Sequence, residues 1–366
     1  MLRAALIGFP NSGKTTLFQL LTHAREGAAS APRGKADANV GVSRVPDTRL
    51  DRLTAMYQPK KRVPATVEFA DTAAAAAGTQ ALVVVAAFRN ADALLHVVRA
   101  FRDAAVPMAS DSIDPARDAQ QMEDELILAD LGIAEKRLER LAKDLKKNRT
   151  ADLAQEQDVL VRCRASLEEG APLRALSLSP ADLRRLRGFQ FLSAKPLLLV
   201  VNLDEADLSS TGEQAVANAP ARAGLDGFVA RAATLAVAVC AKIELEIGLL
   251  EAPDAAAFLA DLGLDASGLD RIIRASYDLL GYISFFTVGE DECRAWSIPR
   301  GTTAQVAAAE IHSDIARGFI RAEVMSYEAL TTRGSQAACR ESGDLRLEGK
   351  EYIVQDGDVI NFRFSV

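Results

Sequence analysis

The stretch Gly8-Phe9-Pro10-Asn11-Ser12-Gly13-Lys14-Thr15 decides the fold class, because it fits the pattern G-x-x-x-x-G-K-[ST]. It follows an apolar run, Ala4 to Ile7, and precedes a helix-forming segment, Thr16 to Leu21. A strand before the glycines and a helix after them are the context that this motif requires. A chance glycine-rich turn is the plain alternative, and the flanking segments speak against it.

The motif predicts a phosphate-binding loop. Glycines let the backbone curl so that N–H groups point inward at phosphate oxygens, and the dipole of the following helix favours negative charge. Lys14 would supply a point charge to the β- and γ-phosphates, and the hydroxyl of Thr15 is placed to ligate Mg²⁺. The predicted phosphate-binding residues are Asn11, Ser12, Gly13, Lys14, Thr15 and Thr16.

Further apolar runs predict the strands of a buried parallel sheet, because they are nearly continuous and do not alternate with polar residues. The predicted strands are Arg3 to Gly8, Val67 to Ala70, Ala93 to Val98, Pro196 to Val201 and Val237 to Cys240. Helical patterns separate them. The sequence therefore predicts an α/β domain with a mostly parallel sheet and helices on both faces.

Polar residues follow several of these strands, at the carboxyl edge where open α/β sheets bind ligands. Asp71 ends the second strand and could hold Mg²⁺ through a water; it could also cap a helix made by the alanines that follow, and the two roles are compatible. Asn202 is expected to hydrogen-bond a purine edge. The segment Cys240-Ala241-Lys242 follows the next strand and is expected to close over the base.

Between residues 116 and 192 the pattern changes to helical hairpin spacing. Apolar residues recur at intervals of three, four and seven, which is typical of coiled coils: Leu131, Ala134, Leu138, Leu141, Leu145, Leu153, Leu160 and Leu167. Basic residues gather on the first helix and tip: Lys136, Arg137, Arg140, Lys143, Lys146, Lys147 and Arg149. They form either a solvated coiled-coil face or a contact with RNA or another polyanion.

From Ile283 onward the chain reads as short strands and turns, with a helix through Gln305 to Ile315. The dipeptide Asp356-Gly357 between alternating apolar segments predicts a closing β-hairpin. The C-terminal part is therefore expected to be a small mixed domain.

Composition fits a globular protein of several domains, since 366 residues exceed one ordinary core. No apolar run is long enough to span a membrane, and the N-terminus reads as a strand, not a signal peptide. The scattered Cys163, Cys240, Cys293 and Cys339 form no CxxC pair, so a reducing cytosol fits best. The net charge of −7 argues against a wholly nucleic-acid-binding surface.

Specific segments along nearly the whole chain resemble the YchF, or Obg-like ATPase, family of P-loop proteins. They are GFPNSGKTTLF, ANVGVSRVPDTRLDRL, KKRVPATVEFAD, ELILADLGIAEKRLERL, NLDE, CAKIELEI, GLDRIIRASYDLLGYISFFTVGEDECRAWSIPRGTTA, FIRAEVMSYEAL and LRLEGKEYIVQDGDVINFRF. The resemblance implies a discontinuous nucleotide-binding domain (residues 1–115 and 193–280), a coiled-coil insert (116–192) and a ubiquitin-like, β-grasp TGS domain (281–366).

The resemblance also implies binding and hydrolysis of ATP in preference to GTP, with Mg²⁺, and binding to ribosomes or RNA through the coiled coil and the TGS domain. The family reads the base with N-x-x-E, which here places Asn202 and Glu205 at the site and Leu203 against the adenine face.

The chain departs from the family at the segments that sense the γ-phosphate. Lys35 stands where the family has a Mg²⁺-binding Thr, and Ala74 stands in place of the Gly of D-x-x-G. Alanine does not share glycine's backbone freedom. We therefore expect nucleotide binding to be retained and hydrolysis to be slow or absent.

Other functions remain open on the sequence alone. One is a nucleotide-dependent scaffold that binds ribosome, RNA or protein without hydrolysis. Another is a degenerate paralogue that binds no nucleotide, against which the intact phosphate loop and NLDE both argue.

Overall fold

The computed structural model describes residues 2–22, 39–71, 86–108, 111–148, 150–208 and 212–365. The chain forms two compact units. The N-terminal unit comprises Met1–Ser43 and Glu68–Leu279, and the C-terminal unit comprises Arg44–Val67 and Leu280–Val366. Among the described residues, no helix is long and apolar enough to cross a membrane.

A six-stranded sheet in the order β2-β4-β1-β5-β6-β7 forms the centre of the N-terminal unit. Its strands are β1 (Leu2–Ile7), β2 (Asn39–Arg44), β4 (Thr66–Asp71), β5 (Ala93–Arg99), β6 (Leu197–Asn202) and β7 (Thr234–Val239). β5 pairs in parallel with β1 and with β6, and β6 pairs in parallel with β7. Every residue of β5 and β6 is buried, as the continuous apolar runs predict for strands covered on both faces.

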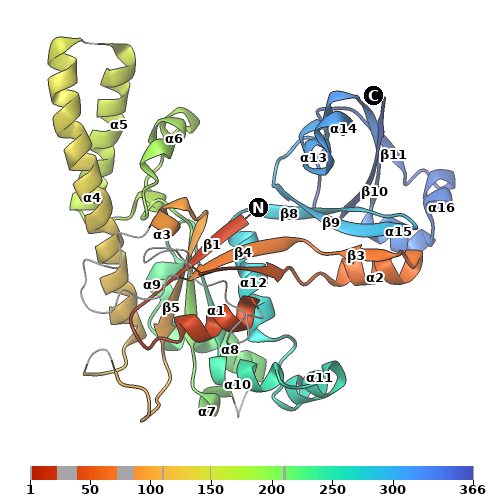
Figure 1. Cartoon of the computed structure of the whole chain (residues 1–366), viewed down its shortest axis with the longest axis horizontal. Coiled ribbons are helices and arrows are strands. Elements are labelled where there is room, and N and C mark those ends of the chain that lie inside the picture. Colours follow the sequence, from red (N-terminus) through yellow and green to blue (C-terminus); the bar gives the residue numbers. More distant parts are fainter. Residues whose placement is uncertain are drawn as a thin grey trace. The chain divides into compact units, whose positions relative to one another are not determined.

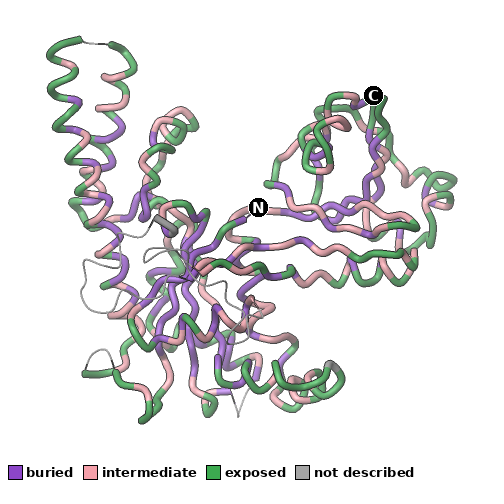
Figure 2. The backbone as a smooth tube through the Cα atoms, viewed as in Figure 1, coloured by how far each residue is buried: buried purple, intermediate pink, exposed green. Residues whose placement is uncertain are grey.

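Helices cover this sheet, and its strands β1, β5 and β6 are almost entirely buried (Figure 2). α1 packs against β1, α10 and α12, whereas α8 and α9 pack against β7 and α4 against β5. The helices are α1 (Lys14–Thr22), α3 (Ala86–Asn90), α7 (Glu205–Leu208), α8 (Gly212–Arg222), α9 (Asp226–Val229), α10 (Ala241–Ile247), α11 (Ala252–Asp261) and α12 (Gly268–Leu279). The N-terminal unit is thus the α/β fold that the sequence predicts.

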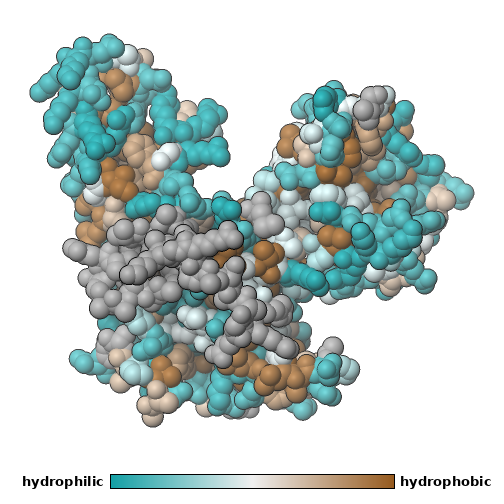
Figure 3. Space-filling model, in the orientation of Figure 1, coloured by the Kyte–Doolittle hydropathy of each residue, from teal (hydrophilic) through white to brown (hydrophobic). Residues whose placement is uncertain are grey.

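Two long helices, α4 (Pro115–Lys147) and α5 (Ala151–Glu168), lie side by side (Figure 1). Asp114 caps α4 and Thr150 caps α5. Their shared apolar cluster contains Ala134, Leu138, Leu141, Val159, Leu160, Cys163 and Leu167. Much of the spacing recognised in the sequence is therefore the seam between the two helices, whose outer surfaces are largely hydrophilic (Figure 3).

The chain returns from α5 to the sheet through short helices: η2 (Leu173–Ala175), α6 (Pro180–Leu186) and η3 (Arg187–Phe189). Buried polar groups fasten the base of α4 to this return segment. Asp130 accepts hydrogen bonds from the backbone N–H groups of Leu192 (2.9 Å) and Ser193 (2.7 Å). Glu123 accepts from Arg174 at 2.6 Å.

A second six-stranded sheet, in the order β11-β10-β12-β8-β9-β3, forms the C-terminal unit. Its strands are β3 (Lys61–Val63), β8 (Tyr282–Thr287), β9 (Glu292–Pro299), β10 (Phe319–Ser326), β11 (Arg346–Glu348) and β12 (Asp358–Phe364). Its helices are α2 (Thr48–Tyr57), α13 (Ala304–Ile311), α14 (Ser313–Arg317), α15 (Tyr327–Arg333) and α16 (Gln336–Glu341).

The prediction of a closing β-hairpin at Asp356-Gly357 is wrong. β12, which follows this turn, pairs antiparallel with β10 and parallel with β8. The residues before the turn form only an isolated bridge, between Ile353 and Thr303. A turn dipeptide specifies a local reversal, but a strand takes its partner from the sheet around it. The single helix expected through Gln305 to Ile315 is likewise divided, because His312 adopts an extended conformation.

Residues 44–67, which the sequence assigned to the nucleotide-binding domain, pack with the C-terminal unit. β3 pairs in parallel with β9, and Arg49 of α2 pairs with Asp356 at 2.8 Å. These partners lie more than two hundred residues further along the chain, so local pattern could not assign them. The other expected domain boundaries stay predictions.

Candidate nucleotide-binding site

The phosphate loop connects β1 to α1 and requires its glycines. Gly8 and Gly13 have φ angles of 144° and 94°, which side chains disfavour. A Cβ on Gly8 would lie 2.5 Å from the carbonyl oxygen of Val97, and one on Gly13 would lie 2.4 Å from Nδ2 of Asn202. The loop therefore sits close against two neighbouring strands, and no other residue fits at either position.

Lys14 lies at the first turn of α1 and is only 8% exposed. Its Nζ donates a hydrogen bond to the carbonyl oxygen of Phe9 at 3.0 Å, so the ammonium is held within the loop. Burial lowers the pKa of Lys14, and the negative charge of Asp71 opposes that shift. The loop thus concentrates positive charge where an anion would be stabilised.

Asp71 ends β4 and is 0% exposed. Burial raises its pKa, while the Thr15 hydroxyl and the Lys14 ammonium lie close enough to oppose that shift. Neither completes a hydrogen bond of ordinary geometry, since both carboxylate oxygens of Asp71 lack a partner among the described residues. A buried carboxylate without donors is costly unless a cation compensates it. The pair Asp71 and Thr15 therefore fits a Mg²⁺ ion.

These residues would hold the ion by oxygen atoms, which Mg²⁺ prefers. Within the described parts of the chain no group of three or more His, Cys, Asp or Glu side chains could hold a metal by itself. The Thr15 hydroxyl would bind the ion, Asp71 would orient its water, and phosphate oxygens of a nucleotide would complete the shell. A bound Mg²⁺ would supply charge stabilisation to those phosphates.

Asn202 joins the phosphate loop to the loop that follows β7. Its side chain, 3% exposed, donates from Nδ2 to the carbonyl oxygen of Ser12 at 3.0 Å. Its Oδ1 accepts from the backbone N–H of Ala241 at 3.1 Å. The expected purine contact of Asn202 stays a prediction; in the structure its amide group holds two loops of the site in register.

The other expected base-binding residues divide into buried and exposed ones. Leu203, expected against the adenine face, is packed in the apolar core beside Cys240, because an apolar side chain directly after a buried strand continues into the core. Glu205 and Lys242 remain exposed and form an ion pair at 2.5 Å. The hydrogen bond that Lys242 donates to the Glu205 carboxylate raises the pKa of Lys242, so this lysine is a cation at neutral pH.

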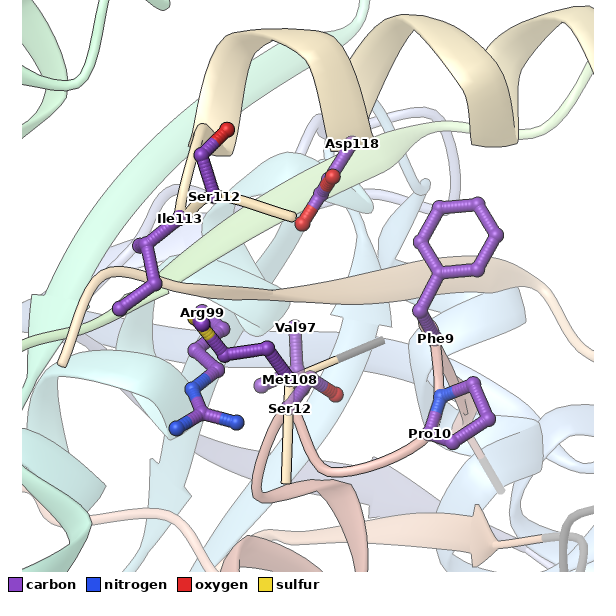
Figure 4. Close-up of a pocket in the computed structure, with 9 residues that line it drawn as sticks. All are labelled: Phe9, Pro10, Ser12, Val97, Arg99, Met108, Ser112, Ile113 and Asp118. Atoms are coloured by element: carbon purple, nitrogen blue, oxygen red, sulfur yellow. The ribbon is translucent and has the colours of Figure 1, made fainter. Parts of the chain in front are cut away.

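Sequence reasoning missed the segment 100–108, which follows β5 and reaches the phosphate loop. Nδ2 of Asn11 donates to the carbonyl oxygen of Pro107 at 3.0 Å. A small pocket of about 20 Å³ lies beside it. Figure 4 shows Phe9 and Pro10 on one side of this pocket and Ile113 on the other. In the sequence, Arg99 could have indicated this segment, because it is a charged residue at the carboxyl end of a buried strand.

His96 lies within β5 and does not reach the surface. Burial, assisted by the charge of Lys14, lowers its pKa to about 3. His96 is therefore a neutral core residue, and its buried Nε2 has no hydrogen-bond partner among the described residues. Lys35 and Ala74, on which the expectation of slow hydrolysis rests, lie outside the described residues, as do His23 and Arg149.

A phosphate-binding loop at the first strand of a parallel sheet, with polar loops after the later strands, defines the class of P-loop nucleotide-binding proteins with a GTPase-like α/β fold. Family models agree: residues 3–136 match one described as "50S ribosome-binding GTPase", and residues 282–365 match YchF-GTPase_C, described as "Protein of unknown function (DUF933)".

Whole-chain comparisons are more specific. The chain is 41% identical to "Ribosome-binding ATPase YchF" of Bacillus subtilis, covering 100% of both proteins. It is 35% identical to "Obg-like ATPase 1" of Oryza sativa, over 100% of this chain and 92% of that protein. The solved YchF GTPase of Schizosaccharomyces pombe superposes with a TM-score of 0.84 at 30% identity, covering 99% of this chain and 97% of the other. The chain belongs to the YchF family.

Proposed function

We propose that this protein is a ribosome-associated regulatory ATPase that binds Mg·ATP in preference to GTP and hydrolyses it slowly. The observation that carries this proposal is the buried, unpartnered Asp71 carboxylate beside Thr15 and Lys14, which suits a Mg²⁺–phosphate complex. The printed names of the relatives, "Ribosome-binding ATPase", support the ribosome and ATP. A ribosome-associated role implies the cytoplasm.

The preference for ATP is supported by the ion pair between Glu205 and Lys242. Guanine presents N–H donors that a free carboxylate at this loop would accept, whereas adenine does not present the same set. Because Lys242 is bonded to Oε2 of Glu205 and neutralises its charge, guanine would have to compete with an ammonium for this carboxylate. Adenine has no such requirement.

Slow hydrolysis is supported by the sequence at Lys35 and Ala74, which replace γ-phosphate-sensing residues of the family. His96 is buried in the core and neutral, with a pKa of about 3, and it cannot touch substrate. The site therefore has residues suited to bind phosphate and Mg²⁺, but the described residues offer fewer groups that could activate a water molecule.

The ribosome or RNA contact is assigned to the paired helices α4 and α5 and to the C-terminal unit, which we infer to be a TGS domain. Arg137 is engaged by Glu156 at 2.7 Å, so it serves the hairpin itself. The remaining described basic residues of this region are exposed: Lys136, Arg140, Lys143, Lys146 and Lys147. Exposed cations on one helix suit a polyanion.

Titration calorimetry with Mg·ATP and Mg·GTP, followed by steady-state phosphate release, tests the proposal. We expect ATP to bind more tightly than GTP, and Lys14→Ala to abolish both binding and a slow turnover. Binding without Lys14-dependent turnover would instead identify a non-hydrolysing nucleotide-dependent scaffold. Absence of binding by the wild-type protein would overturn the proposal.

A further inference from the structure

The segment 100–108 begins at the loop that carries NLDE. The backbone N–H of Ala100 donates to the carbonyl oxygen of Asn202 at 2.9 Å. The backbone N–H of Arg102 donates to Oδ2 of Asp204 at 3.1 Å. The start of the segment is thus fixed to the proposed base loop by two separate hydrogen bonds.

The same segment ends at the phosphate loop, where Asn11 donates to the carbonyl oxygen of Pro107. Asn11 has a φ of 63°, so its backbone is in the left-handed region and its side chain is directed by the loop itself. The segment 100–108 therefore connects the two halves of the proposed nucleotide site.

The buried side chain of Arg99 fixes the backbone conformation of this connecting segment. Arg99 is only 7% exposed. Its guanidinium donates to three carbonyl oxygens: Nε to Phe101 at 3.2 Å, Nη1 to Pro107 at 2.9 Å and Nη2 to Val106 at 3.0 Å. The guanidinium carbon also lies 4.5 Å from the centre of the Phe101 ring. A planar fork of donors suits several carbonyls at once, and a lysine ammonium cannot reproduce it.

We propose that Arg99 is a positioning residue for nucleotide binding, which fixes the segment 100–108 as a strap between the phosphate loop and the base loop. The carbonyl oxygen of Pro107 accepts from both Arg99 and Asn11, so the two side chains act through one shared group. Without Arg99, the Pro107 carbonyl is no longer held in place and Asn11 loses its partner. This inference rests on the proposed nucleotide binding.

A double-mutant cycle on Mg·ATP affinity tests the shared carbonyl. Asn11→Gly removes the side chain without backbone strain, because glycine accepts the left-handed conformation. We expect Arg99→Gln to weaken binding by about tenfold and Asn11→Gly by a smaller factor, as loss of hydrogen bonds of this strength implies. The double variant should bind no more weakly than Arg99→Gln alone, and Arg99→Lys should restore only part of the affinity.

Controls separate positioning from general loss of structure. Arg271→Gln, in α12, removes another arginine that donates to a backbone carbonyl, that of Ala266 at 2.7 Å, and should leave affinity unchanged. Hydrogen exchange should be faster at the amides of residues 101–106 in Arg99→Gln and Arg99→Lys, while β6 amides keep wild-type protection. If Arg99→Gln does not fold, Arg99→Lys takes its place in the cycle.

The outcomes also separate this inference from the proposed function. If wild type binds Mg·ATP and Lys14→Ala does not, the nucleotide site is real. In that case, wild-type affinity in the Arg99 variant, or losses that simply multiply in the double variant, would overturn the role of Arg99 alone. Failure of the wild-type protein to bind would overturn both.

Discussion

Asp71 is a buried carboxylate that lacks hydrogen-bond donors in the described part of the protein. Its carboxylate is buried at the end of β4, and neither oxygen has a hydrogen-bond partner there. Burying such a group lowers the stability of the fold, and a bound cation would reverse the effect. Selection for stability alone would not retain a charge in that place, which is why Asp71 indicates a ligand.

We expect Asp71→Asn to stabilise the protein in the absence of nucleotide and Mg²⁺, by about 1 kcal/mol at neutral pH, because it removes a buried charge. The pKa of Asp71 is raised in the folded state. Protonation of Asp71 therefore adds to the free energy of unfolding. This contribution is fully present below pH 3.8, the ordinary pKa of the carboxyl group, and it is lost as the pH rises through the pKa of the folded state. Urea denaturation of both proteins across this pH range measures the difference.

The same substitution should reverse its effect when Mg·ATP is present. Wild type should then gain more stability than Asp71→Asn, because a charged carboxylate holds the water shell of a cation more strongly than a neutral amide does. Equal stabilisation of both proteins by Mg·ATP would contradict a metal role for Asp71. Repeating the urea denaturation with ATP and a chelator provides the control, in which the nucleotide should stabilise the two proteins by similar amounts.

At the scale of elements, the root of α4 depends on a buried ionic cluster. Glu123 and Arg174 are each 1% exposed at their side chains and lie 2.6 Å apart. Glu123 also meets Arg231 at 3.0 Å. Both arginines lie outside α4, so this carboxylate links the long helix to the return segment and to the chain before β7.

Removing one member of this cluster should be far more damaging than removing both members of the buried pair. Arg174→Met leaves Glu123 short of a buried partner, and we expect a loss of about 3–5 kcal/mol in the free energy of unfolding. The double variant Glu123→Leu with Arg174→Met should be more stable than Arg174→Met, since no buried carboxylate remains. Urea unfolding of each variant measures this.

An exposed ion pair provides the matched comparison. Lys60 and Asp291 lie 2.8 Å apart, but their side chains are 79% and 87% exposed. Lys60→Met should therefore change the unfolding free energy by no more than about 0.5 kcal/mol. A loss at Arg174 as small as this would show that the buried cluster does not hold α4.

At the scale of the whole molecule, a piece of chain from early in the sequence completes the C-terminal unit. α2 and β3 lie between β2 and β4 in sequence, yet they pack with residues 280–366. Arg49 is central to this attachment, because it pairs with Asp356, binds the α2 cap residue Asp47 and lies 5.2 Å from the ring centre of Phe286. The strand β4 that ends in Asp71 is therefore continuous with chain held by the C-terminal unit.

We expect Arg49→Leu to destabilise the C-terminal unit by about 1–2 kcal/mol, a moderate value because the pair is partly exposed to water. Hydrogen exchange should become faster in α2, β8 and β12. Amides of β5 and β6 in the N-terminal unit should keep their wild-type exchange rates. Uniform acceleration across both units, or none at all, would contradict the assignment of residues 44–67 to the C-terminal unit.

The sequence predicted well those features whose cause is local. All five predicted strands exist, near Arg3, Val67, Ala93, Pro196 and Val237. A continuous apolar run suits a strand whose two faces are both covered and buried. The phosphate loop was equally readable, since strand, glycines, lysine and helix are neighbours in the chain. The geometry of the loop after β6 could not be predicted from the sequence. There Leu203 is packed in the apolar core, and Glu205 forms an ion pair with Lys242.

By itself, the sequence determined a P-loop α/β protein and its family resemblance, and it predicted Lys14, Thr15 and Asp71 as site residues. Only the tertiary structure decided that Asn202 clamps Ser12 across 190 positions, and that Arg99 and Asn11 share the carbonyl of Pro107. Likewise, only the tertiary structure showed that Arg49 pairs with Asp356, 307 positions away. The physical reason is that a hydrogen-bonding group has no preferred partner along the chain: its partner is whichever complementary group the folded backbone brings within about 3 Å.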